Sequence, residues 1–236
     1  MADIKYYQKP ERIDATIMER VKKLSPAQLC DGMKTLEIVG DGCMDVGILP
    51  VDDQKVMVGT VCTISTDEGD NFPIHVAVYE PSEGYVMVID GKGYQGRAYL
   101  GDLIGAAANA VGYDGIVVDG CVRDKEGLKN LDIPIFARGF MQRGPSKKGP
   151  GEINSTIFCG GIRVEPGDLI MGDCDGVAVV PRDRILDVLE KAEAKKDYEV
   201  DRRKKIAEYE KRRNAGETLP EIAPQWVIDM KKDMGL

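Results

Sequence analysis

Two adjacent charged residues, Arg123 and Asp124, follow an apolar run at 116–118 that is typical of a buried strand and a turn at Asp119-Gly120. An arginine can bind a carboxylate through two parallel hydrogen bonds, and an aspartate is a hard oxygen ligand for a divalent cation. Ligands of open α/β sheets collect at the carboxyl ends of strands, which is where both side chains would lie. The same two residues also fit a surface ion pair in which Asp124 caps a helix, so both interpretations stay open.

A second candidate is Gly101-Asp102-Leu103-Ile104, which opens the alanine-rich segment 105–110. If a helix begins here, the backbone N–H groups of Leu103 and Ile104 have no partner within the helix and lie at its positive end. Such a helix terminus suits a carboxylate or a phosphate. Asp102 fits equally well as a residue that only caps the helix.

Other patterns favour structure over chemistry. Glycines at 91, 93 and 96 follow an apolar strand and Asp119 ends the next one, as in dinucleotide-binding folds, but too little βαβ sequence follows, so we interpret them as a glycine-rich turn. Residues 173–176 begin like a calcium loop but lack its remainder, which favours a hairpin turn. The single histidine, His75, lies in an apolar stretch and is interpreted as a packed core residue.

The composition excludes several classes of function. The 236 residues carry a formal net charge of -8, and no basic face stands out that could neutralise nucleic-acid phosphates. With one histidine, a metal should be held by carboxylates. The six cysteines form no C-x-x-C pair and lie in apolar stretches, as in a reduced intracellular protein with small buried thiols. No apolar run approaches the ~18 residues of a membrane span, so we expect a cytoplasmic protein without membrane or nucleic-acid partners.

The elements that must position these residues alternate between strands and helices. Strands are predicted at 55–64, 85–89, 116–118 and 135–137, and helices at 25–34, 72–78, up to 110 and 124–131. Short strands at 162–164, 169–172 and 177–180 are joined by turn sequences at 166–168 and 173–176 that favour hairpins. Residues 142–152, rich in Gly, Pro, Ser and Lys, predict a flexible surface loop. This order indicates an α/β fold with some parallel pairing.

A polar segment from Asp183 to Arg213 predicts a long helix that is either solvated or packed against another subunit. No repeat, linker or low-complexity tract divides the chain. We therefore expect one domain, 1–236, with a core of about 24–184 and a helical C-terminal extension at 185–236.

Three stretches of the sequence resemble one known family in order and spacing. They are Gly101–Ile104, Val117–Asp124, and Val164–Asp168 together with Asp173–Val177. The family comprises the class II 4-hydroxy-4-methyl-2-oxoglutarate / 4-carboxy-4-hydroxy-2-oxoadipate aldolases and the related regulator of ribonuclease activity A. The similarity runs from about Leu24 to Arg184, and the helical tail resembles the aldolase branch.

The resemblance implies an αββα layered sandwich related to phosphohistidine swivelling domains, assembled as homotrimers or hexamers with active sites between subunits. It implies a lyase that cleaves a small-molecule 2-oxo acid to pyruvate plus a second 2-oxo acid. The implied cofactor is Mg²⁺ or Mn²⁺, and oxaloacetate decarboxylation is an implied side activity.

The resemblance also assigns roles to the substrate-binding positions. Arg123 matches the arginine that binds the pyruvyl group. The amides of Leu103 and Ile104, next to Gly101, match a cradle for the substrate carboxylate. Departures at Cys121 and in the loop 143–152 leave the distal half of the substrate open.

The metal site is assigned in the same way. Asp124 matches the metal-site aspartate, and Asp102 matches an acidic residue that orients a water molecule at the metal. Glu199, in the variable tail, resembles the glutamate that reaches the metal shell of a neighbouring subunit.

The two branches of this family differ in function. The ribonuclease regulator lacks the metal-binding aspartate and the helical tail, and this chain has both. The sequence therefore favours an enzyme over a non-catalytic regulator that binds a ribonuclease. A lyase or decarboxylase acting on another 2-oxo acid stays open.

Overall fold

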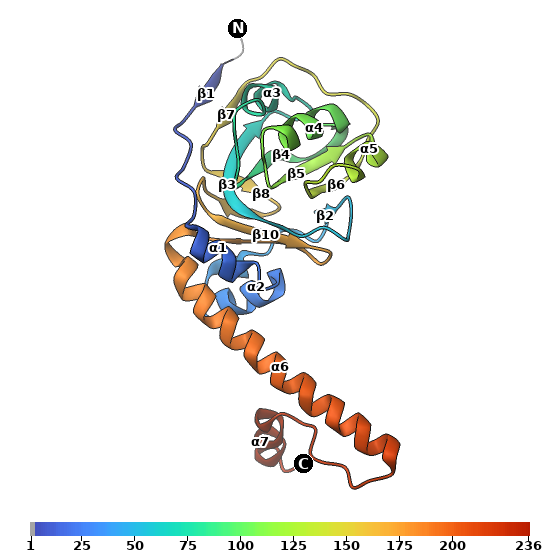
Figure 1. The fold of residues 1–236 in the computed structure, drawn as a ribbon. Coiled ribbons are helices and arrows are strands. Elements are labelled where there is room, and N and C mark those ends of the chain that lie inside the picture. The colour runs from blue at the N-terminus through green and yellow to red at the C-terminus, as the bar shows by residue number, and fades with distance from the viewer. Residues whose placement is uncertain (1–2) are drawn as a thin grey trace. The chain divides into compact units, whose positions relative to one another are not determined.

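Four parallel strands form the centre of the sheet in the computed structural model, which describes residues 3–236 (Figure 1). In spatial order they are β3 (Met57–Thr66), β4 (Tyr85–Ala98), β5 (Gly115–Val122) and β6 (Ile135–Phe140). All eight residues of β5 are buried, as expected for a parallel strand that is covered on both faces. The predicted mixed α/β fold with parallel pairing is confirmed.

The remaining strands extend this sheet or pack beside it. β7 (Gly151–Ile153) and β1 (Ile4–Tyr6) continue it beyond β3, and β2 (Leu49–Pro50) pairs with β6. β10 (Leu169–Asp173) pairs antiparallel with both β3 and β11 (Gly176–Val180), which completes the nine-stranded sheet. β8 (Ile157–Cys159) and β9 (Ile162–Val164) form a separate two-stranded sheet.

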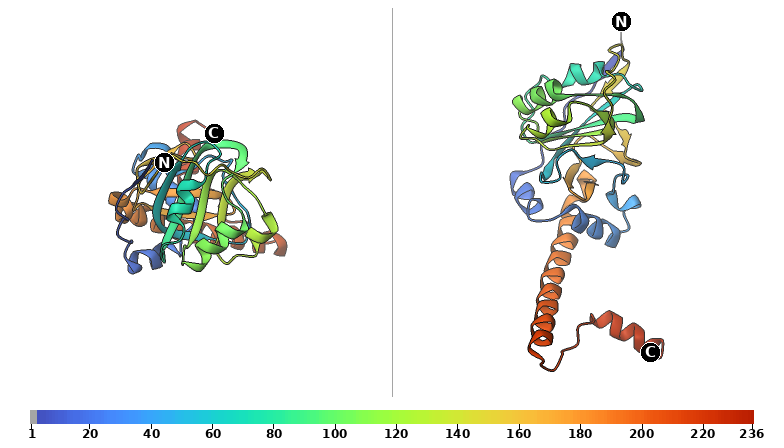
Figure 2. Two further views of the ribbon diagram at one scale, coloured as in Figure 1. Left: turned by 90° about the horizontal axis from the view of Figure 1, so that it is seen from above. Right: turned by 90° about the vertical axis from the view of Figure 1, so that its right-hand side faces the viewer.

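Three clusters of buried side chains pack between the helices and the strands and between the two groups of strands. The first lies between the parallel strands and the helices α3 (Phe72–Ala77), α4 (Asp102–Ala110) and α5 (Lys125–Lys129), which cover one face of the strands (Figure 2). The second lies between the opposite face and the strands β8 to β11. The third joins β10 and β11 to α1 (Ala15–Val21), α2 (Pro26–Thr35) and the first turns of α6 (Ile185–Ala215). The relation to phosphohistidine swivelling domains stays a prediction.

The start of α2 shows how local sequence fixes an element. The Ser25 side chain accepts a hydrogen bond from the Gln28 amide, and the Gln28 side chain accepts one from the Ser25 amide. With Pro26 at the first helical position, this capping box sets where the helix begins.

Residues 91–96, predicted as a glycine-rich turn, belong to β4 but interrupt it, because Lys92 (φ +59°) and Gly93 (φ +68°) are left-handed and the pairing with β5 shifts register between Ile89 and Tyr94. The turn predicted at Asp119-Gly120 is wrong, because both residues lie inside β5. The glycines allow close packing within the sheet. A Cβ at Gly91 or at Gly120 would overlap the fully buried ring of Tyr99. Backbone room around one tyrosine, not a phosphate site, accounts for this part of the glycine pattern.

Two further predictions about connections need correction. Residues 166–168 do not make a hairpin, because β9 pairs with β8 whereas β10 pairs with β3 and β11. The turn is fixed instead by the buried Asp168 carboxylate, which accepts hydrogen bonds from the amides of Glu165 (2.8 Å) and Arg182 (3.0 Å). The hairpin predicted at 173–176 is confirmed, with Asp173 opposite Gly176.

The cysteines are only partly the buried thiols that the sequence suggested. Cys62, Cys121 and Cys159 are buried, whereas Cys43 and Cys174 are exposed. The sulfur atoms of Cys30 and Cys43 lie 2.9 Å apart. None of the helices in residues 3–236 is long and apolar enough to cross a membrane.

The chain divides into two units, Met1–Ala192 and Glu193–Leu236. The second unit holds most of α6 and the helix α7 (Gln225–Asp233). Within it, Arg202 donates a hydrogen bond to the Ile222 carbonyl (2.7 Å), and Arg212 pairs with Glu208 one turn away. The long polar helix that the sequence predicted is confirmed.

Candidate active site

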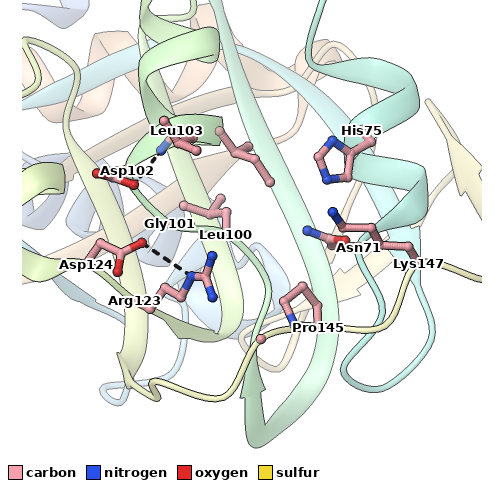
Figure 3. Close-up of a pocket in the computed structure, with 12 residues that line it drawn as sticks. Asn71, His75, Leu100, Gly101, Asp102, Leu103, Arg123, Asp124, Pro145 and Lys147 are labelled. Carbon is pink, nitrogen blue, oxygen red and sulfur yellow. Dashed lines mark hydrogen bonds and ion pairs between the residues drawn. The ribbon is translucent and has the colours of Figure 1, made fainter.

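The carboxyl ends of the four parallel strands supply one pocket of about 260 Å³ (Figure 3). Asn71 and His75 follow β3, residues 100–104 follow β4, Arg123 and Asp124 follow β5, and residues 144–147 follow β6. Parallel strands end at the same edge of a sheet, so side chains from four distant segments meet there. The pocket brings together Gly101, Asp102, Leu103, Ile104, Arg123 and Asp124, all of which the sequence singled out.

Arg123 and Asp124 form an ion pair in the wall of this pocket, with Nε of Arg123 3.3 Å from a carboxylate oxygen of Asp124. Both side chains are more than 40% exposed, so their charged groups remain accessible to a ligand. Asp124 precedes α5 but its side chain makes no capping hydrogen bond, and its backbone has φ +58°. Of the alternative interpretation, a surface ion pair in which Asp124 caps a helix, the ion pair is present and Asp124 precedes α5, but its side chain does not cap the helix.

Gly101 is the residue on which Asp124 packs. A Cβ at this position would overlap the Asp124 carboxylate and lie 2.9 Å from Cγ of Arg123. Its φ of −137° is open to any residue, so the need for glycine comes from this close approach. The absence of a side chain leaves room around the carboxylate.

The N-terminus of α4 opens into the pocket next to Asp102. The predicted helix is confirmed, but one of its two amides is already engaged, because the Leu103 N–H donates to Oδ1 of Asp102 (2.8 Å). Ile104 lies in the first turn, where amides have no acceptor within the helix. An anion here would meet the Ile104 amide directly and would share the Leu103 amide with Asp102.

A second wall, which the sequence did not predict, carries Asn71, His75 and Lys147. In the view of Figure 3 these three lie together, across the pocket from Asp102, Arg123 and Asp124. His75 is partly exposed and not a packed core residue, and its Nδ1 lies 3.3 Å from the Tyr79 hydroxyl. Burial, with the nearby Lys147 charge, lowers the pKa of His75 below its ordinary value, so the ring is neutral at pH 7.

The loop that bears Lys147 is anchored, in contrast to the flexible loop that its composition predicted. The buried carboxylate of Asp70 accepts hydrogen bonds from the Ser146 hydroxyl (2.7 Å) and from the amides of Lys148 (2.7 Å) and Gly149 (3.1 Å). Ser146 also accepts a backbone hydrogen bond from Asn71 (3.0 Å). In the sequence, Asp70 follows two other acidic residues, Asp67 and Glu68, after β3, and no local signal marks it as the one that anchors the loop.

The carboxylates in the pocket fit a hard divalent cation. Asp102 and Asp124 are the acidic side chains among its described lining residues. Mg²⁺ is commonly held by one or two carboxylates together with water and substrate oxygens. The space that Gly101 leaves at Asp124 suits such a ligand set. Glu199 lies on α6 in the second unit, where its carboxylate is 3.5 Å from Arg203.

Asp119, the acidic residue of the glycine pattern, is not available to a cofactor. One of its carboxylate oxygens pairs with Nε of Arg138, and the other accepts a hydrogen bond from the Gly160 amide (2.8 Å). The carboxylate therefore ties β5 to β6 and to the turn between β8 and β9.

Comparison with known proteins places this site in a defined context. Residues 26–179 match the family model described as RraA-like: Aldolase/RraA. A curated relative from Halalkalibacterium halodurans, named "Putative 4-hydroxy-4-methyl-2-oxoglutarate aldolase", is 42% identical over 161 residues, covering 68% of this chain and 77% of the relative.

Solved structures show the same architecture. An uncharacterized protein from Pseudomonas syringae pv. tomato superposes with a TM-score of 0.75 at 26% identity, covering 84% of this chain and 96% of that chain. Streptomyces coelicolor RraAS2, described as an unusual member of the RNase ES inhibitor RraA protein family, superposes with a TM-score of 0.74 at 26% identity, covering 82% of this chain and 98% of its own.

Proposed function

Because the chain belongs to the RraA-like Aldolase/RraA family, we propose that it is a divalent-metal-dependent pyruvate aldolase. Its substrate would be 4-hydroxy-4-methyl-2-oxoglutarate or 4-carboxy-4-hydroxy-2-oxoadipate, cleaved to pyruvate plus a 2-oxo acid. The observation that carries the proposal is the meeting of Arg123, Asp124 and the N-terminus of α4 in one pocket. The name of the 42%-identical relative supports the same reaction class.

Substrate binding follows from the cationic and amide donors of the pocket. The Ile104 amide and the Leu103 amide would bind the substrate carboxylate at the positive end of α4. The Arg123 guanidinium would face the 2-oxo oxygen, where negative charge develops. Two fixed donor groups would thus hold the pyruvyl end in one orientation.

The proposed reaction is a retro-aldol cleavage. The hydroxyl group on C4 loses its proton, a carbonyl forms at C4, and the C3–C4 bond breaks. The electron pair of that bond passes to C3 and is delocalised onto the 2-oxo oxygen as an enolate, which then takes up a proton at C3 to give pyruvate. Loss of CO₂ from oxaloacetate leaves the same enolate, which is why we expect this side activity.

Asp124 and Asp102 would bind the metal ion and a water molecule near it. Asp124 would bind Mg²⁺ or Mn²⁺, with Glu199 of a neighbouring subunit reaching the same shell in a trimer or hexamer. When bound, the ion supplies Lewis-acid polarisation of the 2-oxo group. Asp102, with one oxygen on the Leu103 amide, has its second oxygen to orient a water that relays the C4 hydroxyl proton.

A pyruvate-coupled assay tests the proposal. Purified protein with Mg²⁺ is expected to release pyruvate from both 4-hydroxy-2-oxo acids and from oxaloacetate, and EDTA is expected to stop release from all three. Comparing kcat/KM across the panel identifies the preferred substrate. Absence of pyruvate release, together with tight binding of a ribonuclease, would instead assign the chain to the regulator branch, as the similarity to RraAS2 allows.

A further inference from the structure

Two cysteines from different segments of the chain meet outside the pocket. Cys30 lies on α2, and Cys43 follows the short helix η1 (Val39–Gly42). Their sulfur atoms are 2.9 Å apart, although the residues are separated by 13 positions in the sequence. A disulfide bond places the two sulfur atoms about 2.05 Å apart, so a movement of less than about 1 Å would close it. In residues 3–236, no other two cysteine sulfur atoms are in contact.

Both sulfur atoms are carried by packed backbone. Cys30 lies one turn before Met33, which is fully buried in the third cluster. The chain turns back after α2 through residues 37–42, most of which are left-handed. Cys43 then pairs with Ala178 of β11 in an antiparallel bridge. The contact between the two sulfur atoms is therefore set by the fold on each side.

The two thiols differ in exposure, and this difference assigns their roles. Cys43 is exposed, whereas Cys30 is half-buried. Burial, the contact with Cys43 and the nearby carboxylates of Asp41 and Asp31 raise the pKa of the Cys30 thiol, so it keeps its proton at pH 7. Cys43 is thus the sulfur that a dissolved oxidant reaches first, and Cys30 is placed to react with the product.

We propose that Cys30 and Cys43 form a reversible disulfide when the protein is exposed to a hydroperoxide. The Cys43 thiolate attacks one oxygen of hydrogen peroxide, so that an S–O bond forms, the O–O bond breaks and hydroxide leaves. The Cys30 sulfur then attacks the Cys43 sulfur. The S–S bond forms as the S–O bond breaks, and the hydroxyl group leaves as water with the proton of the Cys30 thiol. The two thiols lose two electrons, which the peroxide gains.

The disulfide would close a loop that forms one wall of a second cavity. Residues 38–40 and Gly42 line a groove of about 710 Å³ together with Phe158 of β8 and Ile162 of β9. A cross-link between Cys30 and Cys43 excludes extended conformations of this loop from the unfolded chain. Oxidation therefore stabilises the folded state. The pair does not line the pocket at the strand ends, so this inference is independent of the proposed aldolase reaction.

The test uses the full chain after reduction and removal of the reductant. Hydrogen peroxide is added, the remaining thiols are blocked with N-ethylmaleimide, and peptides are mapped by mass spectrometry without reduction. We expect peptides joined through Cys30 and Cys43, two fewer blocked thiols per chain, and full reversal by dithiothreitol. The matched control is Cys174→Ser, because Cys174 is also exposed but has no sulfur contact within residues 3–236. This variant should behave like the wild type.

Two further variants separate the steps. Cys30→Ser keeps the exposed sulfur without its partner, so oxidation should stop at a sulfenic acid on Cys43 that dimedone traps. Cys43→Ser should form no disulfide at Cys30. In urea unfolding, peroxide should raise the midpoint by about 1 M for the wild type and Cys174→Ser but not for Cys43→Ser. Absence of the joined peptides in the wild type, an equal yield of disulfides through Cys174, or an unchanged midpoint despite the joined peptides would overturn the proposal.

Discussion

Arg123 has two proposed interactions. Its guanidinium pairs with Asp124 through Nε, and its remaining N–H donors would bind a ligand. A planar guanidinium has five N–H donors, so one ion pair does not exhaust it. This is the property that a lysine cannot reproduce, since an ammonium group is a compact point charge.

We therefore expect Arg123→Lys to lower kcat/KM for pyruvate release by roughly 100-fold or more, the scale of losing a preorganised donor at developing charge. Steady-state kinetics with oxaloacetate measure the loss, and circular dichroism checks that the fold is kept. A variant that retains more than half of the wild-type kcat/KM would show that the two-point geometry is not needed.

Gly101 gives a steric test of the same site. Gly101→Ala places a methyl group onto the Asp124 carboxylate, so pyruvate release should fall at least about tenfold while the unfolding free energy changes little. The control is Gly161→Ala, where the added Cβ meets nothing within 4 Å but the backbone has φ +80°, so the change strains the backbone without filling the site. That variant should lose about 1 kcal/mol of unfolding free energy and keep its activity. Full pyruvate release by Gly101→Ala, or loss of pyruvate release by Gly161→Ala, would refute the packing argument.

At the scale of elements, Asp70 joins the loop after β6 to the start of α3. Burial raises the pKa of Asp70, but hydrogen bonds from the Ser146 hydroxyl and from the amides of Lys148, Phe72 and Gly149 outweigh it and hold the pKa below its ordinary 3.8. These bonds favour the charged form in the folded protein. The loop that carries Lys147 is thus stabilised by an ionised carboxylate.

This arrangement predicts a pH dependence. Since the pKa is lower in the folded state, the stabilisation is complete well above pH 3.8 and is lost as the pH falls below 3.8 toward the folded-state value. At pH 7, Asp70→Asn should cost about 1.5 to 3 kcal/mol, the value of hydrogen bonds to a charged group. Urea unfolding of both proteins from pH 7 to pH 3 measures the difference, which should shrink only at the acid end. A difference that does not change with pH would contradict the account.

The strand ends explain what the sequence could and could not predict. Arg123 and Asp124, and residues 101–104, were identifiable because an apolar run precedes each group and the residue types suit anion and metal binding. Asn71, His75 and Lys147 carry no such signal. They reach the pocket only because β3 and β6 flank β4 and β5 in the sheet. The order in which strands pair cannot be predicted from any single segment of the sequence. Gly91 and Gly120 were misread for a related reason, since their common neighbour Tyr99 becomes visible only in the folded sheet.

At the scale of the whole molecule, the chain has a first unit with the pocket and a second, helical unit with Glu199. The Leu103 side chain at the pocket is 80% exposed and so is accessible to another copy of the chain. We expect a trimer or hexamer in solution, measurable by light scattering after size exclusion.

Shared sites predict complementation between inactive variants. Asp124→Ala and Glu199→Ala should each be inactive alone, whereas co-expressed mixtures should recover about a quarter of the activity, because one site in four then combines an intact Asp124 with an intact neighbouring Glu199. Recovery is measured per mole of mixed oligomer. Mixtures as inactive as the parents would place Glu199 outside the active site.

The most direct test of the metal-dependent aldolase is Asp124→Ala in a chelator-stripped assay with Mg²⁺ added back. Wild-type protein should regain pyruvate release from oxaloacetate and from 4-hydroxy-4-methyl-2-oxoglutarate as the Mg²⁺ concentration rises, because the Asp124 carboxylate that packs against Gly101 would bind the ion. The variant, with an unchanged fold by circular dichroism, should release no pyruvate above background at any Mg²⁺ concentration. Near-wild-type turnover by Asp124→Ala would contradict the mechanism.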